Sequence, residues 1–343
     1  MSKFYGIDLG TRTLKIYKKG DGIVYDEKNI LAIADESRII AIGNEAFDML
    51  GKAPSNISVT YPVKYGVIAD IKNMNSMLNL VFEKVGSKYG KMNGGDFIIT
   101  TPTDITEVEK KAFVDLIMGT NIKPKKCRIV DRPVADALGA GLNVTDAVGV
   151  MVVDIGADTT EISVLSLGGI VLSKLIPVGG NKLDENIISL VRKKYNLVIG
   201  NKTAETIKMS LATATEPLDS TVSSIKVFGR DVVNGLPTEK EIDSKFVYEA
   251  IKEHIDAIVD AIKLILERTP PEISADIIDT GIYLTGGSAL ISNLDRLIAS
   301  VTELEVHVCA NPGDSVACGL GKIIDNSELD VLASKLKTPS FKD

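Results

Sequence analysis

Short runs of apolar, β-branched residues alternate along this chain with longer segments in which apolar positions recur every three or four residues. Runs such as 97–102 and 152–155 are bounded by Gly, Pro or Asp, a pattern typical of buried strands. Segments such as 105–118 and 244–267 have the spacing of an amphipathic helix, and the second ends before two prolines. This alternation predicts an α/β fold in which helices cover a sheet.

The same reasoning predicts the remaining elements. The first part of the chain is interpreted as a meander of strands, 59–71 as a connector, and 86–96 as a polar, Gly-rich loop. We expect a hairpin at 223–233 with its turn at Gly229. Further strands are expected at 5–17, 22–25, 30–34, 39–43, 127–130, 156–164, 170–176, 281–285 and 306–309. Further helices are expected at 45–50, 74–85, 133–142 and 203–214. One more helix is opened by the segment 178–184 and runs to about 195, and the last begins at about 315.

The most informative motif is an Asp-x-Gly bend between two apolar strands. It occurs as Asp154-Ile155-Gly156-Ala157-Asp158-Thr159-Thr160, and near the start as Asp8-Leu9-Gly10-Thr11-Arg12-Thr13. Backbone N–H groups and Thr hydroxyls at such a bend can converge on an anion, while the Asp at the strand end can hold a cation through water. One copy alone is more often a plain turn. Two copies indicate related halves that grip one polyphosphate from opposite sides of a cleft.

Two Gly pairs lie where the chain enters a helix. Gly286 and Gly287 follow the apolar run at 281–285, and Gly179 and Gly180 precede the helix that ends near 195. Gly at such a point lets the backbone approach a ligand closely, with the N–H groups of the helix facing it. An ordinary loop explains a Gly pair before a helix equally well.

Composition narrows the classes of function. The 343 residues, 45% of them hydrophobic, are enough for two domains with large cores, or for one domain pair. The formal net charge of −7 argues against general nucleic-acid binding, which needs a basic face. No apolar run approaches the roughly 20 residues that span a bilayer, and we expect neither a signal peptide nor a leading amphipathic helix before the first strand. We therefore expect a cytoplasmic protein.

The cysteines and histidines offer no catalytic or metal-binding pattern. Cys127, Cys309 and Cys318 are widely spaced, odd in number and without a CxxC pair, which fits buried free thiols in a reducing compartment. His254 and His307 are isolated, so we expect structural positions for both. This inventory supports neither a zinc site nor a Ser-His-Asp triad.

These motifs together resemble those of the actin-like ATPase superfamily. The two Asp-x-Gly hairpins and the turn at Thr285-Gly286-Gly287 carry the resemblance, and Lys15 looks like the phosphate-facing lysine of actin. Further stretches are similar to those of MreB and Mbl, the bacterial cell-shape actins, and coverage runs from about Gly6 to Ile324. These stretches are Gly66-Val67-Ile68-Ala69-Asp70, Ala137-Leu138-Gly139-Ala140-Gly141-Leu142, Leu167-Gly168-Gly169-Ile170-Val171, Thr203-Ala204-Glu205-Thr206-Ile207-Lys208, Pro270-Pro271-Glu272-Ile273-Ser274-Ala275-Asp276-Ile277 and Asn293-Leu294-Asp295-Arg296-Leu297.

The resemblance implies an actin-like fold. In that fold two duplicated α/β domains, each with a small inserted subdomain, surround a nucleotide cleft. Subunits of the family assemble into filaments, which in MreB-like proteins are usually paired antiparallel protofilaments. Carried over to this chain, the implied boundaries are 1–32, 66–144 and 317–343 for subdomain IA, 33–65 for IB, 145–180 and 245–316 for IIA, and 181–244 for IIB.

The same resemblance implies a site for ATP and Mg²⁺. Asp8 and Asp154 would position the metal through water molecules. Glu205 and Lys208, one helical turn apart, would meet the ribose and base, and a solvated salt bridge between them is the alternative. The other residues expected to bind the nucleotide are Gly10, Thr11, Thr13, Lys15, Gly156, Thr160, Gly179, Gly180, Gly286, Gly287 and Ser288.

Two positions depart from the family's pattern. MreB-like chains usually have Glu-Glu-Pro, with the second Glu helping to orient the attacking water, where this chain has Asp131-Arg132-Pro133. An Arg cannot accept a proton at neutral pH, although it could stabilise charge on the γ-phosphate. Asp158 replaces a family Gly and either supplies the missing carboxylate or repels phosphate. With Thr159, Asp158 and Arg132 as candidate catalytic residues, we expect ATP binding with slow hydrolysis.

Other functions of the same fold remain as alternatives. A small-molecule kinase needs an acceptor pocket and a catalytic Asp that the sequence does not reveal. A plasmid-partitioning actin matches less closely than the shape-determining branch. A chaperone-type ATPase is disfavoured, because we expect no peptide-binding domain after residue 324.

Membrane contact is a separate expectation. The loop expected at 86–96 offers only Tyr89 and Met92, so no apolar anchor is evident. The C-terminal segment 329–343 could touch an anionic surface, but a disordered tail is the favoured interpretation. The residues concerned are Lys335, Lys337, Phe341 and Lys342.

Overall fold

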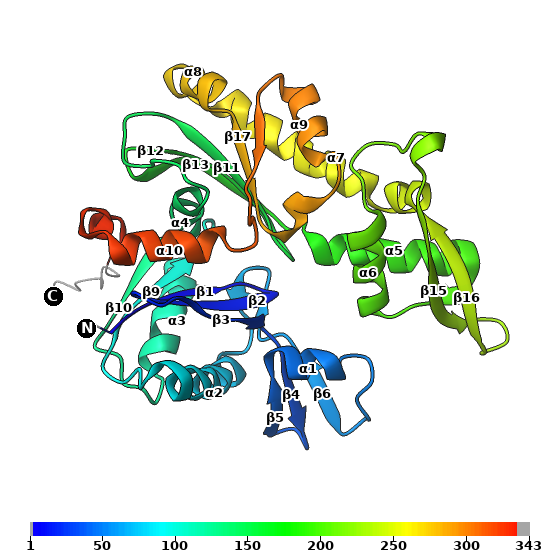
Figure 1. Cartoon of the computed structure of the whole chain (residues 1–343), viewed down its shortest axis with the longest axis horizontal. Coiled ribbons are helices and arrows are strands. Elements are labelled where there is room, and N and C mark those ends of the chain that lie inside the picture. Colours follow the sequence, from blue (N-terminus) through cyan, green and yellow to red (C-terminus); the bar gives the residue numbers. More distant parts are fainter. Residues whose placement is uncertain (1–2, 335–343) are drawn as a thin grey trace. The chain divides into compact units, whose positions relative to one another are not determined.

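The computed structural model describes residues 3–334 of the 343-residue chain. These residues form two compact units. Unit 1 comprises residues up to 147 together with 165–170 and 313–334, and unit 2 comprises 148–164 and 171–312. Each unit has a five-stranded sheet and its own hydrophobic core (Figure 1).

Unit 1 is built on a mixed sheet with the strand order β10-β9-β1-β2-β3. The first apolar run of the chain forms β1 (Phe4–Leu9), which pairs antiparallel with β2 (Thr13–Lys18) and parallel with β9 (Asp96–Thr101). The sheet is completed by β3 (Gly22–Lys28) and by β10 (Lys126–Asp131), which is parallel to β9. The carboxyl ends of β1, β9 and β10 therefore meet at one edge, and the β1–β2 turn lies there.

Helices cover both faces of this sheet. In Figure 1, α2 (Ile71–Tyr89) and α3 (Glu107–Met118) lie on one face, and α4 (Arg132–Gly139) and α10 (Ser315–Asp325) on the other. The start of α3 is fixed by a reciprocal capping box, in which the Thr106 hydroxyl and the third helical residue satisfy each other's backbone N–H groups. Buried side chains of α2 and α3 pack into the core below β1 and β9.

Helices α4 and α10 approach each other backbone to backbone. A Cβ atom at Gly139 would lie 1.7 Å from the carbonyl oxygen of Ser315, and one at Gly319 would lie 1.7 Å from that of Ala135. The Ser315 hydroxyl also donates a hydrogen bond to the carboxylate of Asp136, which is fully buried. This close packing fixes α4, and with it the residue that begins the helix, against the sheet.

A smaller sheet with the order β5-β4-β6 also belongs to unit 1. It consists of β4 (Leu31–Ala34), β5 (Arg38–Ile42) and β6 (Ile57–Thr60), and it packs on α1 (Gly43–Met49). A two-stranded ribbon follows, formed by β7 (Val63–Lys64) and β8 (Val67–Ile68).

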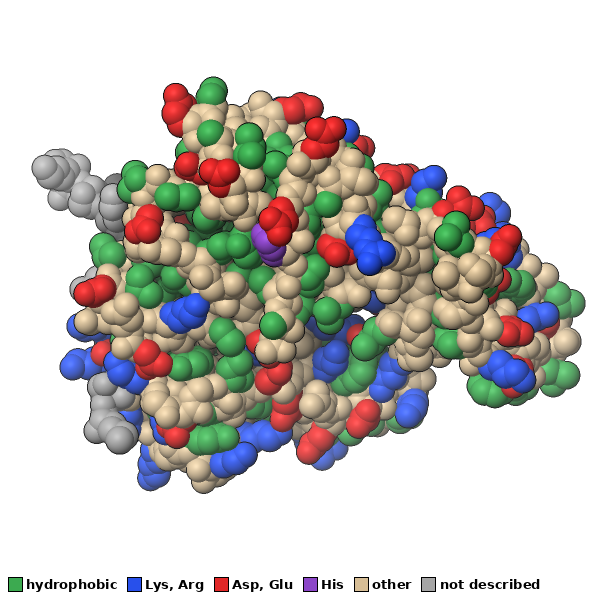
Figure 2. Space-filling view, turned by 45° about the horizontal axis from the view of Figure 1, so that its top comes forward, with side chains coloured by type: hydrophobic (Ala, Val, Ile, Leu, Met, Phe, Trp, Pro, Cys, Tyr) green, Lys and Arg blue, Asp and Glu red, His purple; other side chains and the backbone are tan. Residues whose placement is uncertain are grey.

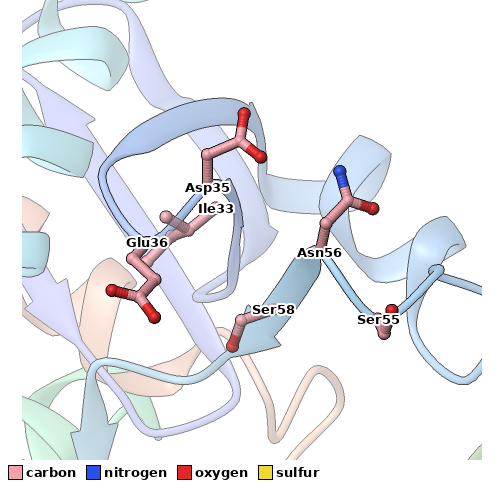
Figure 3. Close-up of a pocket in the computed structure, with 6 residues that line it drawn as sticks. All are labelled: Ile33, Asp35, Glu36, Ser55, Asn56 and Ser58. Atoms are coloured by element: carbon pink, nitrogen blue, oxygen red, sulfur yellow. The ribbon is translucent and has the colours of Figure 1, made fainter.

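A pocket of about 510 Å³ lies at the end of this small sheet. Figure 3 shows Asp35 and Glu36 at the β4–β5 turn, Asn56 just before β6 and Ser58 in β6. Both acidic residues have a positive φ, 51° and 61°, because the turn is tight. None of the residues expected to bind nucleotide lines this pocket.

Unit 2 has a sheet with the order β13-β12-β11-β17-β18. Its central strand, β11 (Val150–Ile155), is parallel to β17 (Ile282–Thr285), which is parallel to β18 (Val306–Val308). The other two strands are β12 (Thr160–Ser166) and β13 (Gly169–Ile176). The turns that follow β11 and β17 therefore lie side by side at one edge of this sheet.

The longest helix of unit 2 is α7 (Ser244–Arg268), which begins as predicted because the Asp243 carboxylate accepts the N–H of Phe246. A second, three-stranded sheet has the order β14-β15-β16. The remaining elements are α5 (Gly180–Tyr195), β14 (Leu197–Val198), α6 (Asn201–Leu211), β15 (Ser224–Asp231), β16 (Pro237–Asp243), α8 (Pro271–Thr280), α9 (Leu294–Thr302) and the short helices η1 (Asp219–Thr221), η2 (Gly287–Leu290) and, in unit 1, η3 (Ser327–Leu332). Across residues 3–334, no helix is both long and apolar enough to span a bilayer.

The predicted alternation of strands and helices is confirmed, but the hairpin in the second sheet is placed differently. Strand β15 continues through Gly229, and the turn lies at 232–236. The Asp231 carboxylate holds this turn by accepting hydrogen bonds from the N–H groups of Val233 and Asn234. A Gly within a strand was therefore wrongly interpreted as a turn.

Several elements went unpredicted or were predicted too short. Helix α2 extends to Tyr89, four residues into the loop expected at 86–96. Helices α8 and α9 and strand β6 were not predicted. In α8 the prolines that end α7 also begin the next helix, since Pro at the first helical position needs no N–H partner.

The C-terminal part of the described chain is held on β10. Arg128 forms a 2.6 Å ion pair with Asp330, and Ile129 exchanges two backbone hydrogen bonds with Ser334. The residues proposed above to touch an anionic surface, Lys335, Lys337, Phe341 and Lys342, lie outside the described residues.

Candidate functional site

The first Asp-x-Gly motif forms the tight β1–β2 turn of unit 1. The N–H of Gly10 donates to the carbonyl oxygen of Thr13 at 3.0 Å, and a Cβ at Gly10 would lie 3.0 Å from that same oxygen. The side-chain amide of Asn29, fully buried, donates to the carbonyl oxygen of Gly10 at 2.7 Å. The Thr11 hydroxyl accepts a weak hydrogen bond of 3.4 Å from the N–H of Gly66. The loop is thus held in place from three directions.

Asp8, the acidic residue of this motif, is only 7% exposed and lies next to Arg132. A guanidinium nitrogen of Arg132 is 3.6 Å from the Asp8 carboxylate and donates to the carbonyl oxygen of Leu9 at 3.2 Å. The Thr100 hydroxyl lies 3.4 Å from the same carboxylate. This contact follows from the topology, because β1, β9 and the β10–α4 junction end at the same edge of the sheet.

Lys15 projects from β2 and is almost fully buried. Its ammonium donates to the carbonyl oxygen of Gly313 and to the carboxylate of Asp314, and lies 3.9 Å from Asp26. Burial raises the pKa of Asp26 above its usual value, and the charge of Lys15 opposes that rise. The structure therefore places Lys15 in an acidic cluster within unit 1, and its predicted phosphate contact stays a prediction.

The second motif forms the turn after β11 in unit 2. The N–H of Gly156 donates to the carbonyl oxygen of Thr159 at 2.9 Å, as Gly10 does to Thr13 in unit 1. The Asp158 carboxylate accepts a 2.7 Å hydrogen bond from the side-chain amide of Asn181. The Thr160 hydroxyl, fully buried, donates to the carbonyl oxygen of Val178 at 2.7 Å. The two turns thus have the same backbone closure, which is the internal repeat that the sequence predicts.

The start of α5 lies directly against this turn. The N–H of Gly180 donates to the carbonyl oxygen of Gly156 at 3.0 Å, and that of Asn181 donates to the carbonyl oxygen of Ala157 at 2.7 Å. A Cβ at Gly179 would lie 2.7 Å from the Ala157 carbonyl. Gly179 is therefore required for the close approach of these two backbone segments.

Gly286 makes a similar approach to Asp154. Its φ is +77°, and a Cβ there would lie 2.3 Å from the Asp154 carboxylate and 2.5 Å from the carbonyl oxygen of Ile155. Ser288, in η2, donates to the carbonyl oxygen of Gly156 at 3.3 Å. Gly287 lies between them with open space around its Cα.

Lys208 joins the two helices of this region. Its ammonium donates to the Asp184 carboxylate at 2.9 Å and to the carbonyl oxygen of Gly180 at 2.8 Å. Both side chains of the ion pair are largely buried, at 13% and 9% exposure. Glu205 lies one turn earlier on α6 and is half-buried. The structure thus links Lys208 to α5, a pairing that sequence spacing within α6 could not reveal.

The predicted residues are gathered at one sheet edge in each unit. Unit 1 brings together Asp8, Gly10, Thr11, Thr13 and Arg132, with Lys15 further along β2. Unit 2 gathers Asp154, Gly156, Asp158, Thr159, Thr160, Gly179, Gly180, Lys208, Gly286, Gly287 and Ser288 around the ends of β11 and β17, with Glu205 on α6. Sequence reasoning missed Asn29, Asp184 and Asp314, which support these residues and belong to no motif.

No three His, Cys, Asp or Glu side chains in the described part of the chain are grouped closely enough to hold a metal ion. A magnesium ion usually keeps several waters and is bound through one or two carboxylates together with phosphate oxygens. The assignment of Asp8 and Asp154 to a magnesium ion therefore stays a prediction from the sequence.

The geometry and the comparisons agree on the class of protein. The structure matches that of MreB5 of Spiroplasma citri bound to ADP, with a TM-score of 0.90 and 31% sequence identity. The match covers 96% of this chain and 98% of that one. MreB 5 bound to AMPPNP matches with a TM-score of 0.89 at 30% identity. A MamK double helical filament matches with a TM-score of 0.77 over 95% of this chain and 99% of that one, at 19% identity, a likeness of fold alone. The chain has an actin-like fold.

The sequence comparisons specify the family. The model of the MreB/Mbl protein family matches residues 2–331. The cell shape-determining protein Mbl of Bacillus subtilis (strain 168) is 42% identical over 324 residues, which cover 94% of this chain and 96% of that protein. The cell shape-determining protein MreB of Escherichia coli (strain K12) is 39% identical over 324 residues, 93% and 92% of the two chains. The chain belongs to the MreB/Mbl family.

Proposed function

We propose that this protein binds ATP and assembles into cytoskeletal filaments that act in cell shape, or in motility if the cell lacks a wall. Two relatives near 40% identity are named cell shape-determining proteins, and MreB5 of Spiroplasma citri has been solved with both ADP and AMPPNP. The match extends over almost the whole length of each of these proteins.

One observation carries the nucleotide proposal. Each unit closes an Asp-x-Gly turn with the same Gly N–H to Thr carbonyl hydrogen bond, at the carboxyl edge of its sheet. Around the turn in unit 2, Cβ atoms at Gly179 and Gly286 would collide with neighbouring backbone or carboxylate, so both glycines keep these segments in close contact. Each turn carries Thr hydroxyls and backbone N–H groups of the kind that bind phosphate.

For the metal, we propose Asp8 and Asp154 as the residues that hold Mg²⁺ through water. When bound, the ion would neutralise charge on the β- and γ-phosphates. Thr11, Thr13, Thr159 and the Gly residues of the two turns would orient the phosphates. Glu205, Lys208, Gly286, Gly287 and Ser288 would meet the adenosine, and the four subdomain boundaries given above are part of the same proposal.

Hydrolysis is proposed to be slow. The side chain at the position of the family's water-orienting Glu is the Arg132 guanidinium, which lies 3.6 Å from Asp8 and cannot accept a proton at neutral pH. Asp158, the other candidate, is engaged with Asn181. Arg132→Glu should therefore release phosphate faster than the natural protein, and an unchanged rate would contradict this part of the proposal.

Self-association is proposed because the chain belongs to the MreB/Mbl family, whose subunits, by the resemblance described above, assemble into filaments. Several large hydrophobic side chains are strongly exposed, among them Val108 at 78%, Met209 at 79% and Val233 at 82%. On the face drawn in Figure 2, hydrophobic side chains are interspersed with acidic and basic ones. Pairing into antiparallel protofilaments and contact with an anionic membrane are the finer parts of the proposal.

Family membership argues against a small-molecule kinase and against a plasmid-partitioning role. Sedimentation of the purified protein with ATP, followed by electron microscopy of the pellet, tests the proposal directly. A filament protein should pellet with ATP, whereas a kinase should stay in the supernatant. Failure to bind ATP together with failure to polymerise at any salt concentration would overturn the proposal.

A further inference from the structure

Arg132 and Asp8 form a largely enclosed ion pair at the turn where the phosphates are proposed to bind. Their side chains are 12% and 10% exposed, and the nearest oxygen and nitrogen are 3.6 Å apart. The guanidinium also donates to the carbonyl oxygen of Leu9, the residue between Asp8 and the Gly10 turn. The pair therefore lies directly beside the β1–β2 turn.

The position of Arg132 is set by the fold. The residue begins α4, which cannot shift away from the sheet because Gly139 and Gly319 bring α4 and α10 into backbone contact. Asp8 is equally fixed, near the end of the central strand β1. The positive charge is thus held beside the carboxylate by the packing of unit 1, and two charges at this distance interact strongly when water is largely excluded.

Such a pair changes what the Asp8 carboxylate can do. A carboxylate that already has a cation beside it attracts a second cation less strongly, because the guanidinium and a hydrated metal ion repel each other. It also repels a triphosphate less, because its negative charge is balanced. A fixed Arg at this point therefore supplies part of the charge balance that a divalent cation normally supplies.

We propose that Arg132 is the built-in counter-ion of Asp8, so that this protein takes up a nucleoside triphosphate with little dependence on a divalent cation. The inference rests on the proposed nucleotide site and deepens it. Arg132 acts as a positioning and charge-balancing residue whose effect on binding passes through Asp8. A purely structural role, limited to the hydrogen bond with Leu9, predicts no change in metal dependence when the charge is removed.

The test measures the dissociation constant of a fluorescent ATP analogue in EDTA and in excess Mg²⁺. For the natural protein, we expect the two values to agree within about threefold. In Arg132→Gln, which keeps a hydrogen-bond donor but loses the charge, binding in EDTA should weaken by about tenfold or more, and Mg²⁺ should restore it. Arg132→Lys keeps the charge and should behave more like the natural protein.

Two further variants make the result specific. Arg128→Gln removes an Arg of β10 that pairs with Asp330 on the surface, so it should leave both dissociation constants unchanged. The double variant Asp8→Asn/Arg132→Gln removes both charges, so its binding in EDTA should recover toward that of the natural protein. Circular dichroism of each variant confirms that it is folded.

The outcomes separate the inference from the proposed function. If the affinity of the natural protein for the analogue falls by about a hundredfold or more in EDTA, the inference is wrong, whatever the variants do. The proposal that the protein binds nucleotide then still stands. Equal metal dependence in the natural protein and in Arg132→Gln also overturns it. Absence of binding under both conditions contradicts the proposed nucleotide site, and the inference with it, while sedimentation still tests the proposed filament assembly.

Discussion

Arg12 donates a 2.7 Å hydrogen bond to the hydroxyl of Tyr61, and its guanidinium lies 5.4 Å from the centre of the Tyr61 ring. The same guanidinium lies 5.1 Å from the centre of the Phe47 ring in α1. Arg12 belongs to the β1–β2 turn, whereas Phe47 and Tyr61 belong to the small sheet and its helix. One side chain thus anchors the proposed phosphate loop to the small sheet of unit 1.

Arg12→Ala should destabilise the protein by about 1–3 kcal/mol, because it removes a hydrogen bond and two cation–π contacts in a partly buried place. Urea unfolding followed by circular dichroism measures this change. Arg38→Ala is the matched control, since Arg38 is highly exposed and pairs with Asp35 at only 3.7 Å. Its effect should stay below about 0.5 kcal/mol. Equal effects of the two substitutions would show that Arg12 is not an anchor.

Gly286→Ala should unfold at a clearly lower temperature than the natural protein. The new Cβ would lie 2.3 Å from the Asp154 carboxylate in a backbone conformation with φ +77°, so strain and a steric collision add together. The expected cost is about 2 kcal/mol or more. Gly287→Ala is the control for stability, because nothing lies within 4 Å of its added Cβ. Matching melting temperatures for the two variants would contradict this account.

The sequence was sufficient for the two repeated turns and for the class of fold. Asp-x-Gly followed by Thr is a local pattern, and local backbone geometry realises it, as the equivalent hydrogen bonds at Gly10 and Gly156 show. The start of α7 was also predictable, because Asp243 acts within three residues of the helix it caps. Signals of this kind depend only on residues that are close together in the sequence, so a single sequence is enough to detect them.

The supporting contacts were not predictable. Asp184 and Lys208 are 24 residues apart, and Lys15 and Asp314 are 299 residues apart. Nothing in the spacing of either pair indicates contact, because packing of α5 on α6 and the return of α10 to the first sheet bring them together. The hairpin turn was misplaced for a related reason, since the Gly229 signal was local but the strand pairing that overrides it is not.

Stability should fall as the pH rises above about 9, and Cys127 should account for part of the loss. Burial raises the pKa of this thiol from 9.0 to about 12. Between these values the unfolded chain has lost the proton while the folded chain keeps it, so folding becomes less favourable with rising pH, by at most about 1.4 kcal/mol per pH unit. Burial and the hydrogen bond with Asp325 likewise raise the pKa of Tyr17 to about 12.

Cys127→Ala separates the thiol from the tyrosines. Urea unfolding at several pH values from 8 to 11 measures how the free energy of unfolding changes with pH. For this variant the free energy should fall less steeply with rising pH than for the natural protein. Cys318→Ala is the comparison, since this thiol is exposed and its pKa is raised less strongly. Equal slopes of the free energy of unfolding against pH for the natural protein and Cys127→Ala would contradict the raised pKa of the Cys127 thiol.

The ion pair of Lys208 and Asp184 should be costly to break from one side. Lys208→Met leaves the Asp184 carboxylate, 7% exposed, without the ammonium that now lies 2.9 Å from it. Removing one partner of a buried pair destabilises a protein by about 3–5 kcal/mol, whereas replacing both by apolar residues of similar size is often close to neutral. Lys208→Met/Asp184→Leu should therefore unfold at a higher urea concentration than Lys208→Met alone.

The exposed pair Lys226 and Glu239, 2.8 Å apart on the β15–β16 hairpin, gives the matched control. Lys226→Met should change the free energy of unfolding by less than about 1 kcal/mol, because water screens both charges there. If Lys208→Met were as mild as Lys226→Met, the pair between α5 and α6 would be solvated in solution. Lys208 would then be available to a ligand at no cost to the fold, as the sequence-based prediction of a nucleotide contact requires.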